Sequence, residues 1–551
     1  MSGVALVVLL TLLGLSTVQA EDPYHFFEWH VTYGTISPLG VPQQVILINN
    51  QFPGPEINCT SNNNIIVNVF NKLDEPFLLS WNGIQHRKNS WMDGMPGTNC
   101  PIMPGKNWTY HFQPKDQIGS FFYFPSIGMQ KASGGMGMIR VHSRLLIPVP
   151  YTDPADEFNI LAGEWYTKSH KVLARFLDSG RGIGRPAGVL INGKHGKDAS
   201  GKDEPPMFTV EAGKTYRFRV CNIGIKNSLN FRIQKHALRL VEMEGSHVVQ
   251  NMYDSLDLHI GQCFSVFVTA DQQPGDYYIL ASTRFTKYKC DGSAIIRYAG
   301  SNTPPSKDLP PGPSGWAWSF NQWRSFRWNL TASAARPNPQ GSYHYGQINI
   351  TRTIRLRGGT GLVNGKRRYA INGVSHDNPV TPFKLSEYFG IADKEFKYNI
   401  IGDEPPTGKS PITIAPNVVN CTFRTFIEII LENPERSIHA YHIDGYAFFP
   451  VGKMGHGEWD PEKRRTYNLL DASSRHTVQV YPKSWSAIML TFDNAGMWNL
   501  RTLVWDKQYL GQQLYFSVVS PARSLRDEYN IPENALLCGN VVKLPQPAPY
   551  T

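Results

Sequence analysis

Beyond its first twenty residues, the chain lacks any hydrophobic run long enough to span a bilayer. Residues 1–20 carry no charge, contain the apolar stretch Val4–Leu15 and end in Val18-Gln19-Ala20, with small residues where a signal peptidase cleaves. We expect a signal peptide at 1–20 rather than a transmembrane helix or a buried first strand. The Pro-rich C-terminus lacks the hydrophobic tail of a lipid-anchor signal. The sequence therefore predicts a secreted protein with no transmembrane segment.

Acidic residues are fewer than basic ones, 44 Asp and Glu against 54 Lys and Arg, and the net charge is +10. The excess survives cleavage after residue 20, because residues 1–20 are uncharged. No nucleic-acid-binding motif is present, so nucleic acid is not an expected partner. The basic balance either serves solubility alone or attracts a polyanion.

Cysteine is sparse, and its seven positions are Cys59, Cys100, Cys221, Cys263, Cys290, Cys421 and Cys538. In an oxidising compartment we expect most of them to pair, with one left over. Five glycosylation sequons, at Asn58, Asn107, Asn329, Asn349 and Asn420, fit the same compartment and predict a glycoprotein.

Apolar and polar residues alternate at period two in several short segments, which is typical of strands with one buried face. Residues 216–220 and 427–431 are examples, with Arg217, Arg219 and Glu428 on the polar side. A strand of this kind followed by a second strand recurs three times, at 65–83, 216–233 and 427–445. The sequence therefore predicts an all-β chain with three repeated sandwich domains.

Four segments carry the motifs that bear most directly on function. Residues 80–84 read Ser-Trp-Asn-Gly-Ile, 119–124 read Gly-Ser-Phe-Phe-Tyr-Phe, 439–445 read His-Ala-Tyr-His-Ile-Asp-Gly, and 494–498 read Asn-Ala-Gly-Met-Trp. Related framework residues extend from about Tyr33 to about Val519. On these motifs the chain resembles the multicopper oxidases, and within them the plant L-ascorbate-oxidase-like group with its skewed-growth and pollen-specific homologues.

Most ligand positions of these motifs hold other residue types. The resemblance places copper ligands at ten replaced positions: Ser80, Asn82, Phe124, Ser126, Asp444, Arg501, Thr502, Leu503, Lys507 and Gln512. Two histidines remain as vestiges, His439 of the single-copper site and His442 of the three-copper cluster. Copper sites need several imidazoles or thiolates converging on one ion, whereas Arg501 and Lys507 would add positive charge. We expect no copper, or at most one, and no catalytic residue.

The resemblance implies three tandem cupredoxin-like Greek-key β-sandwich domains, at 21–147, 148–315 and 316–551. The Pro-rich stretch 301–313 ends the second domain, and the third includes the C-terminal tail. The resemblance also implies a disulfide between Cys100 and Cys538; the partners of the other cysteines stay open.

Two functions are compatible with these features. The first is a secreted, noncatalytic cell-wall glycoprotein that supports pollen tube or other polarised wall growth. The alternative is an oxidoreductase with a reduced, monocopper-type complement, in which His456 could join His439 and His442. The ligand inventory favours the first function.

In a plant wall the polyanion that a basic protein meets is acidic polysaccharide such as pectin. The candidate contacts are four basic runs: Arg87 and Lys88; Lys194 and Lys197; Lys366, Arg367 and Arg368; Lys463, Arg464 and Arg465. The tryptophan-rich stretch 316–328 either stacks on sugars or packs between domains, and packing is the commoner outcome.

Overall fold

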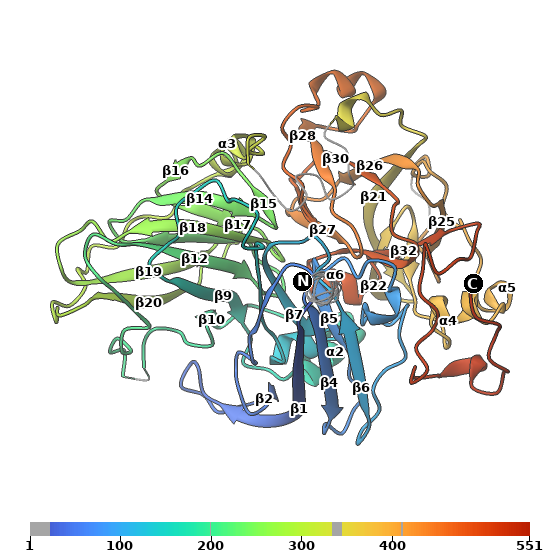
Figure 1. Ribbon diagram of the computed structural model, residues 1–551, viewed down its shortest axis with the longest axis horizontal. Coiled ribbons are helices and arrows are strands. Elements are labelled where there is room, and N and C mark those ends of the chain that lie inside the picture. Colours follow the sequence, from blue (N-terminus) through green and yellow to red (C-terminus); the bar gives the residue numbers. More distant parts are fainter. Residues whose placement is uncertain (1–21, 199, 333–343, 409–410) are drawn as a thin grey trace, which may run out of the picture.

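The computed structural model describes residues 22–198, 200–332, 344–408 and 411–551, without the side chains of residues 453–456. The expected signal peptide at 1–20 lies outside this range, as does the side chain of His456. The described strands form six sheets, two for each of the segments 24–142, 157–298 and 352–519, which we call domains 1, 2 and 3 (Figure 1). The predicted all-β fold of three two-sheet sandwiches is confirmed. The exact domain boundaries stay predictions.

Domain 1 pairs the sheet β2-β1-β4-β6 with the sheet β3-β8-β7-β5. The strands are β1 (Tyr24–Ile36), β2 (Gln43–Ile48), β3 (Ile57–Thr60), β4 (Asn64–Asn71), β5 (Leu79–Asn82), β6 (Asn107–Phe112), β7 (Gly119–Pro125) and β8 (Gly137–His142). Their apolar side chains enclose one core around Trp29 and Trp81, both fully buried.

Domain 2 pairs a seven-stranded sheet, β10-β9-β12-β18-β14-β15 with β16 beside β14, with the sheet β11-β20-β19-β13-β17. Its elements are β9 (Glu157–Trp165), α2 (His170–Asp178), β10 (Gly188–Ile191), β11 (Phe208–Val210), β12 (Thr215–Asn222), β13 (Leu229–Ile233), β14 (Leu238–Met243), β15 (Ser246–His247), β16 (Met252–Tyr253), β17 (Leu256–Leu258), β18 (Cys263–Thr269), β19 (Asp276–Thr283) and β20 (Asp291–Tyr298).

Domain 3 pairs the sheet β24-β23-β22-β21-β26-β30-β28 with the sheet β25-β32-β31-β27-β29. Its elements are β21 (Arg352–Val363), β22 (Lys366–Ile371), β23 (Val374–His376), α4 (Phe383–Tyr388), α5 (Ala392–Glu395), β24 (Thr413–Ala415), β25 (Val418–Thr422), β26 (Phe426–Asn433), β27 (His439–Ile443), β28 (Phe449–His456), β29 (Thr477–Val480), β30 (Ser484–Thr491), β31 (Gly496–Thr502), α6 (Trp505–Tyr509) and β32 (Gln513–Val519).

The internal repeat is confirmed at the level of topology. In each domain the first repeat strand, β4, β12 or β26, pairs in parallel with the domain's opening strand. The following strand, β5, β13 or β27, belongs to the opposite sheet. Each repeat therefore crosses from one layer of its sandwich to the other.

The expectation that only one face of these strands is buried was wrong. Arg217 and Arg219 are 6% and 1% exposed, and Glu428 is fully buried. Arg219 donates to Ser120 Oγ of domain 1 (3.1 Å) and to Glu157 Oε2 (2.7 Å), because the outer face of β12 packs against strand β7. Period-two alternation reported the two faces correctly. The polar face of β12 is closed in part by domain 1, whereas Glu428 of β26 is covered by Arg464 and Tyr467 of its own domain.

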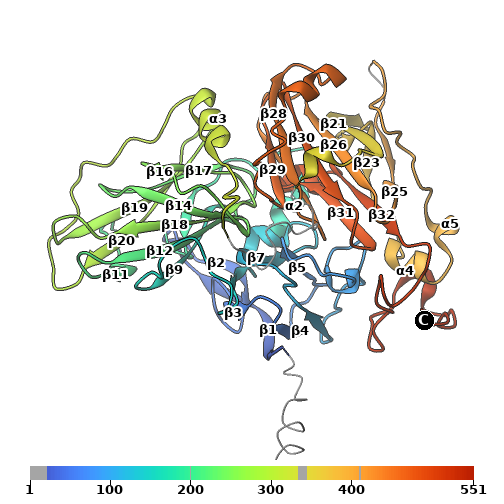
Figure 2. The ribbon, with the colours of Figure 1, turned by 45° about the horizontal axis from the view of Figure 1, so that its top comes forward.

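Domain 1 lies beneath and between domains 2 and 3 (Figures 1 and 2). Helix α3 (Trp316–Ser325) bridges the other two: Gln322 Oε1 accepts from the backbone of Asp257, and Ser319 Oγ lies 2.9 Å from the hydroxyl of Tyr481. Trp316 stacks on Phe285 at 3.9 Å between ring centroids. The aromatic stretch therefore packs between domains.

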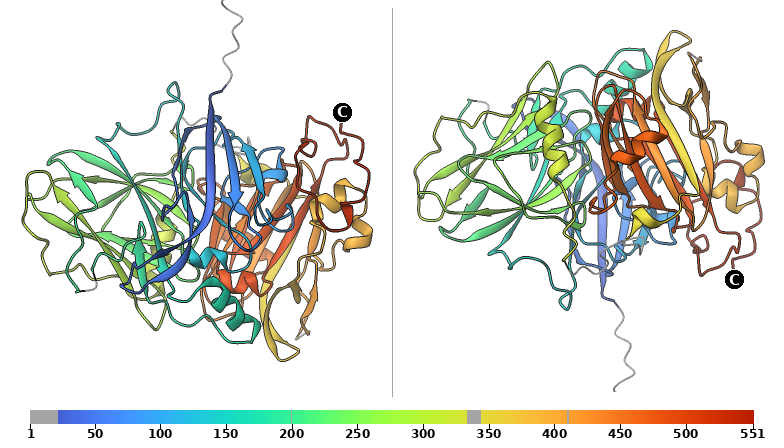
Figure 3. Two further views of the ribbon diagram at one scale, coloured as in Figure 1. Left: turned by 90° about the horizontal axis from the view of Figure 1, so that it is seen from below. Right: turned by 90° about the horizontal axis from the view of Figure 1, so that it is seen from above.

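Two disulfides are present. Cys100–Cys538, which the resemblance implied, is confirmed, and it fastens the C-terminal tail to domain 1 across 438 residues. The tail runs beside α4 and α5 (Figure 3). Cys221–Cys263 joins neighbouring strands β12 and β18.

The expectation of a single unpaired cysteine was wrong. Cys59, Cys290 and Cys421 are all free. They belong to domains 1, 2 and 3 respectively, so each is enclosed in a different sandwich and none meets another. Burial raises the pKa of the Cys59 and Cys421 thiols to about 12, which keeps both protonated.

Candidate functional site

The four copper-type motifs lie on two strand pairs. In domain 1, β5 pairs with β7, which sets Ser80 opposite Phe124. In domain 3, β27 pairs with β31, which sets His442 opposite Arg501. The two pairs meet at the domain boundary, where the Arg501 guanidinium lies 5.8 Å from the centre of the Phe124 ring. Asn494 fixes this boundary by donating to the carbonyls of Gln85 and Gly445 (2.8 and 2.9 Å).

The first buried site, which we call the arginine site, consists of His442, Asp444, Arg501 and His476. Arg501 is fully buried, donates to Asp444 Oδ2 and also to Asn499 Oδ1 (3.1 Å). His442 Nε2 lies 2.8 Å from Asp444 Oδ1, and its Nδ1 lies 2.7 Å from the carbonyl of His476. One carboxylate thus holds both a guanidinium and an imidazole.

The charge balance of the arginine site is set by Asp444. Burial by itself would raise the pKa of Asp444, but the Arg501 guanidinium and the hydrogen bond with His442 outweigh it and bring the pKa to about 2. Burial drives the pKa of His476 well below its usual value, and the neighbouring His442 and Arg475 lower it further. Asp444 is therefore an anion and His476 a neutral ring near pH 7.

The second buried site, the lysine site, consists of Glu435, Ser437, His439 and Lys507. The Lys507 Nζ lies 2.6 Å from His439 Nε2, 2.6 Å from Glu435 Oε2 and 3.1 Å from Ser437 Oγ. Burial and the adjacent ammonium lower the pKa of His439, so its ring is neutral and accepts from Lys507. Burial would raise the pKa of Glu435, but its contact with His439 Nε2 at 3.5 Å and the Lys507 charge bring it to about 2.

The remaining replaced positions are packed rather than charged. Thr502 is buried and its hydroxyl faces the carbonyl of Ala440 (3.4 Å), and Leu503 packs against Ile260. Ser126 Oγ donates to the carbonyl of Gly94 (2.5 Å). Three of these uncharged replaced positions keep buried atoms without a hydrogen-bond partner among the described residues: the hydroxyl of Ser80, Oδ1 of Asn82, and both amide atoms of Gln512.

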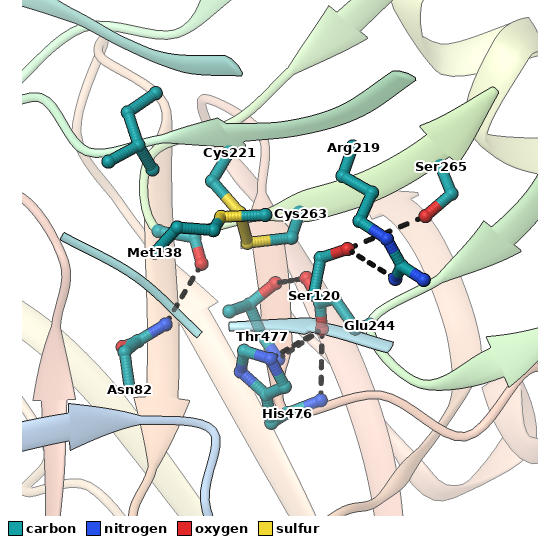
Figure 4. Close-up of a disulfide and its surroundings, with 12 residues drawn as sticks. Asn82, Ser120, Met138, Arg219, Cys221, Glu244, Cys263, Ser265, His476 and Thr477 are labelled. Carbon is teal, nitrogen blue, oxygen red and sulfur yellow. Dashed lines mark hydrogen bonds and ion pairs between the residues drawn. A yellow bond between two sulfur atoms is a disulfide. The ribbon is translucent and has the colours of Figure 1, made fainter. Parts of the chain in front are cut away.

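Several residues of the buried region were missed by sequence reasoning, because they fall outside the four motifs. Glu244 of domain 2 accepts from the backbone nitrogens of His476 and Thr477 (both 2.9 Å), which ties domain 2 to the arginine site (Figure 4). Asn82 donates to the carbonyl of Gly261 (3.1 Å), so it also reaches domain 2. The one signal that the sequence offers is Glu244 itself, a single acidic residue directly after the apolar strand β14.

Gly83, a glycine of the first copper-type motif, is required by the backbone and not by a metal ligand. Its φ is +89°, and a Cβ there would lie 2.5 Å from Nε2 of His476. Both the backbone angle and the contact exclude a larger residue. The framework is thus held by packing of the polypeptide itself.

A third cation is buried at the same domain boundary. Lys131 is 1% exposed, and its Nζ lies 5.0 Å from the ring centre of Phe124, 5.1 Å from Trp505 and 5.8 Å from Phe122. Burial and the nearby Arg501 charge lower its pKa to about 7. The aromatic faces supply the attraction that a carboxylate would otherwise give.

Copper is the metal that the motifs imply, and the donors present do not fit it. The lone pair of His439 Nε2 is directed at Lys507, and both ring nitrogens of His442 face oxygen acceptors. Thr502 supplies no thiolate, and Arg501 adds a fixed positive charge. Within the described ranges, no group of three or more His, Cys, Asp or Glu side chains is arranged to hold a metal ion.

Three sandwiches with copper-type motifs at the boundary of the first and third define a blue-copper-oxidase architecture. Sequence models described as multicopper oxidase match residues 30–145, 156–301 and 380–524. The chain belongs to the multicopper oxidase family.

Its relatives include plant proteins of nearly equal length. An L-ascorbate oxidase homolog of Brassica napus is 65% identical and the alignment covers 97% of this chain and 96% of the relative. A monocopper oxidase-like protein, SKU5, of Arabidopsis thaliana is 49% identical over 98% and 94%. Among solved structures, the laccase of Botrytis aclada shares the fold at a TM-score of 0.73 and 23% identity, covering 91% and 89%.

The part of the chain with described coordinates contains no helix both long and apolar enough to cross a membrane. The sequon asparagines are accessible: Asn58, Asn107, Asn349 and Asn420 are exposed, and Asn329 is half-buried. Glycosylation itself stays a prediction.

Proposed function

We propose that this chain is a secreted cell-wall glycoprotein that keeps the oxidase scaffold for binding and not for four-copper oxidation. The observation that carries the proposal is the contact between Lys507 Nζ and His439 Nε2 at 2.6 Å. A side-chain cation is aimed at the donor atom that copper would need, and at the other site Arg501 is buried opposite His442 and shares the Asp444 carboxylate with it. The protein supplies its own positive charge at both sites.

The monocopper-type alternative draws on the printed name of relatives such as SKU5 of Arabidopsis thaliana. In this chain a copper ion bound to Nε2 of His439 would have to displace Lys507. The other ring nitrogen, Nδ1, faces the Tyr441 hydroxyl at 3.4 Å, so His439 would offer the ion a single ligand atom. The displaced ammonium would be left buried beside the metal, which is electrostatically unfavourable. The donors therefore favour the noncatalytic function.

The proposed partner is an acidic wall polysaccharide such as pectin, and the proposed role is support of pollen tube or other polarised wall growth. The net charge of +10 supports the partner, and the five accessible sequons support the compartment. The growth role rests on the resemblance to the plant group.

The four candidate basic runs differ in how free their charges are. Lys197 and Asp203 are paired at 2.5 Å, and Lys194 lies 3.6 Å from Glu204. The run 463–465 is paired throughout, with Asp460, Glu428 and Glu462. Lys366 and Arg367 are exposed, and Arg87 and Lys88 line a groove. Paired runs contribute less to polyanion binding than free ones.

A pectin column tests the proposed partner. The glycosylated protein should be retained by de-esterified pectin at 0.1 M salt and released towards 1 M, because the screening length falls from about 10 Å to about 3 Å. Methyl-esterified pectin should retain it weakly, since esterification removes the carboxylates. No retention at low salt would refute the proposed partner, and retention that ignores salt and esterification would refute an electrostatic mechanism.

A further inference from the structure

A wide groove separates domain 1 from domain 3 and the C-terminal tail. Its volume is about 810 Å³, which lies in the range of roughly 300–1,000 Å³ that ligand sites occupy. One wall comes from residues 86–89 and 111–116 of domain 1, and the other from 423–424 and 493 of domain 3 and 526–529 of the tail. The tail wall is fixed, because Tyr529 N donates to the carbonyl of Lys88 (2.9 Å) and Trp91 Nε1 donates to that of Tyr529 (3.1 Å).

The groove carries an excess of positive charge. Five Lys and Arg residues line it against three Asp residues. Two of the carboxylates are engaged by groove arginines: Asp493 by Arg87 at 2.9 Å and Asp527 by Arg424 at 3.1 Å. Lys88, Lys115 and Arg526 also line the groove and form no ion pair with a described carboxylate. These three cations are available to an anionic ligand.

The groove also offers the uncharged contacts that a sugar needs. Tyr529 is 48% exposed, and Phe423 is half-buried. The Lys88 ammonium lies 5.7 Å from the Tyr529 ring centre and the Arg424 guanidinium 5.0 Å from that of Phe423, so each ring lies beside a cation and leaves only part of its surface open. An aromatic ring covers the apolar C–H face of a sugar, and a tyrosine adds a polar tip. His86 is 1% exposed at the base of the groove, and neither of its ring nitrogens has a hydrogen-bond partner among the described residues. Asn89 Oδ1 is likewise buried and unpartnered.

We propose that this groove binds a short anionic oligosaccharide, a stretch of uronic-acid residues, with Lys88, Lys115 and Arg526 facing the carboxylates and Tyr529 covering a sugar ring. The inference rests on the proposed function and gives it a location. It also distinguishes a defined site in the groove from a diffuse attraction by the net positive charge. The other basic runs are mostly paired with carboxylates or lie outside the groove.

The test compares two triple variants of the full-length glycosylated protein. The groove variant is K88A/K115A/R526A. The matched control is K289A/K307A/K397A, which removes the same charge at three exposed positions outside the groove and outside the four candidate basic runs. Binding to a de-esterified oligogalacturonide is measured by calorimetry at 0.1 M salt. The groove variant should lose affinity by about tenfold or more, as expected from three lost charge-assisted contacts, and the control should change less than about twofold.

The outcomes distinguish binding in the groove from nonspecific electrostatic binding by the net positive charge. Equal losses in both variants would overturn the groove as the site while leaving electrostatic pectin binding intact. No binding by the unaltered protein would overturn the groove and the proposed partner together. An unchanged thermal midpoint in both variants checks that the fold is preserved.

A second variant distinguishes a saccharide from any other polyanion. Y529A should weaken oligogalacturonide binding severalfold and leave binding of polyglutamate unchanged, because polyglutamate has no sugar ring to stack. Equal effects on both probes, or none on the saccharide, would overturn the saccharide as the ligand.

Discussion

At the residue scale, the arginine site and the lysine site both hold charges that are balanced within the protein. Arg501 and Asp444 are buried together, and Lys507 shares Glu435 with His439. A buried pair adds little stability over an apolar pair of the same shape, yet removing one partner leaves a charge with no compensation. These residues are therefore coupled, and single substitutions should cost more than double ones.

The Asp444→Asn variant tests this coupling. The free energy of unfolding should fall by about 3–5 kcal/mol, because Arg501 remains buried without its carboxylate. The double variant D444N/R501M should recover much of that loss, since no buried charge is left. Chemical denaturation of the three proteins measures both effects; a loss below about 1 kcal/mol for D444N would show that the pair is not coupled in this way.

Lys131 gives a pH-dependent prediction with a fixed sign. Its pKa is lowered from 10.5 to about 7 by burial and by Arg501. Between pH 7 and 10.5 the unfolded chain binds more protons than the folded chain, so stability rises with pH across this window and the lysine's cost is constant below it. Lys131→Met should remove that rise and stabilise the protein at pH 6, by up to a few kcal/mol. Parallel stability–pH curves above pH 7 would contradict the buried charge.

At the element scale, the C-terminal tail is held to domain 1 by one covalent and several backbone contacts. The Cys100–Cys538 disulfide closes a loop of 438 residues, which in the chain-entropy model stabilises the fold by about 6 kcal/mol at most. The C100S/C538S variant should release the tail to proteolysis near residue 529 and weaken oligosaccharide binding, because one groove wall is lost. Peptide mapping after limited proteolysis measures the release; a tail as resistant as before would show that its noncovalent contacts suffice.

The sequence predicts the strands themselves better than it predicts what covers them. Strand repeats at β4, β12 and β26 were predictable, because alternation records which side chains share a face. Burial of Arg217 and Glu428 was not predictable, because the covering element comes from a distant segment. The resemblance singled out Asp444, Arg501 and Lys507, which the structure places in the two buried sites, and their replacement of copper ligands stays a prediction. The partners Glu435, His476 and Glu244 were not predictable, since no motif contains them. The three free cysteines follow from their separation in three sandwiches.

At the scale of the whole molecule, the arrangement of the three sandwiches separates a buried domain boundary from an open groove. The buried face between domains 1 and 3 is satisfied by internal ion pairs, and the open groove beside it keeps unpaired cations. The scaffold of an oxidase thus has a closed interior and a charged exterior cleft. The proposed loss of four-copper oxidation and the proposed saccharide binding are compatible on one fold, because they concern different residues.

The central claim is that side-chain cations occupy both former copper sites. Its most direct test is elemental analysis and visible absorption of the glycosylated protein, purified from its native source and dialysed against copper. The account predicts well below one tightly held copper per chain and no blue band, because Thr502 provides no thiolate for the thiolate-to-copper transition and Lys507 is directed at His439. One or more tightly held coppers per chain, or an intense blue band, would contradict it.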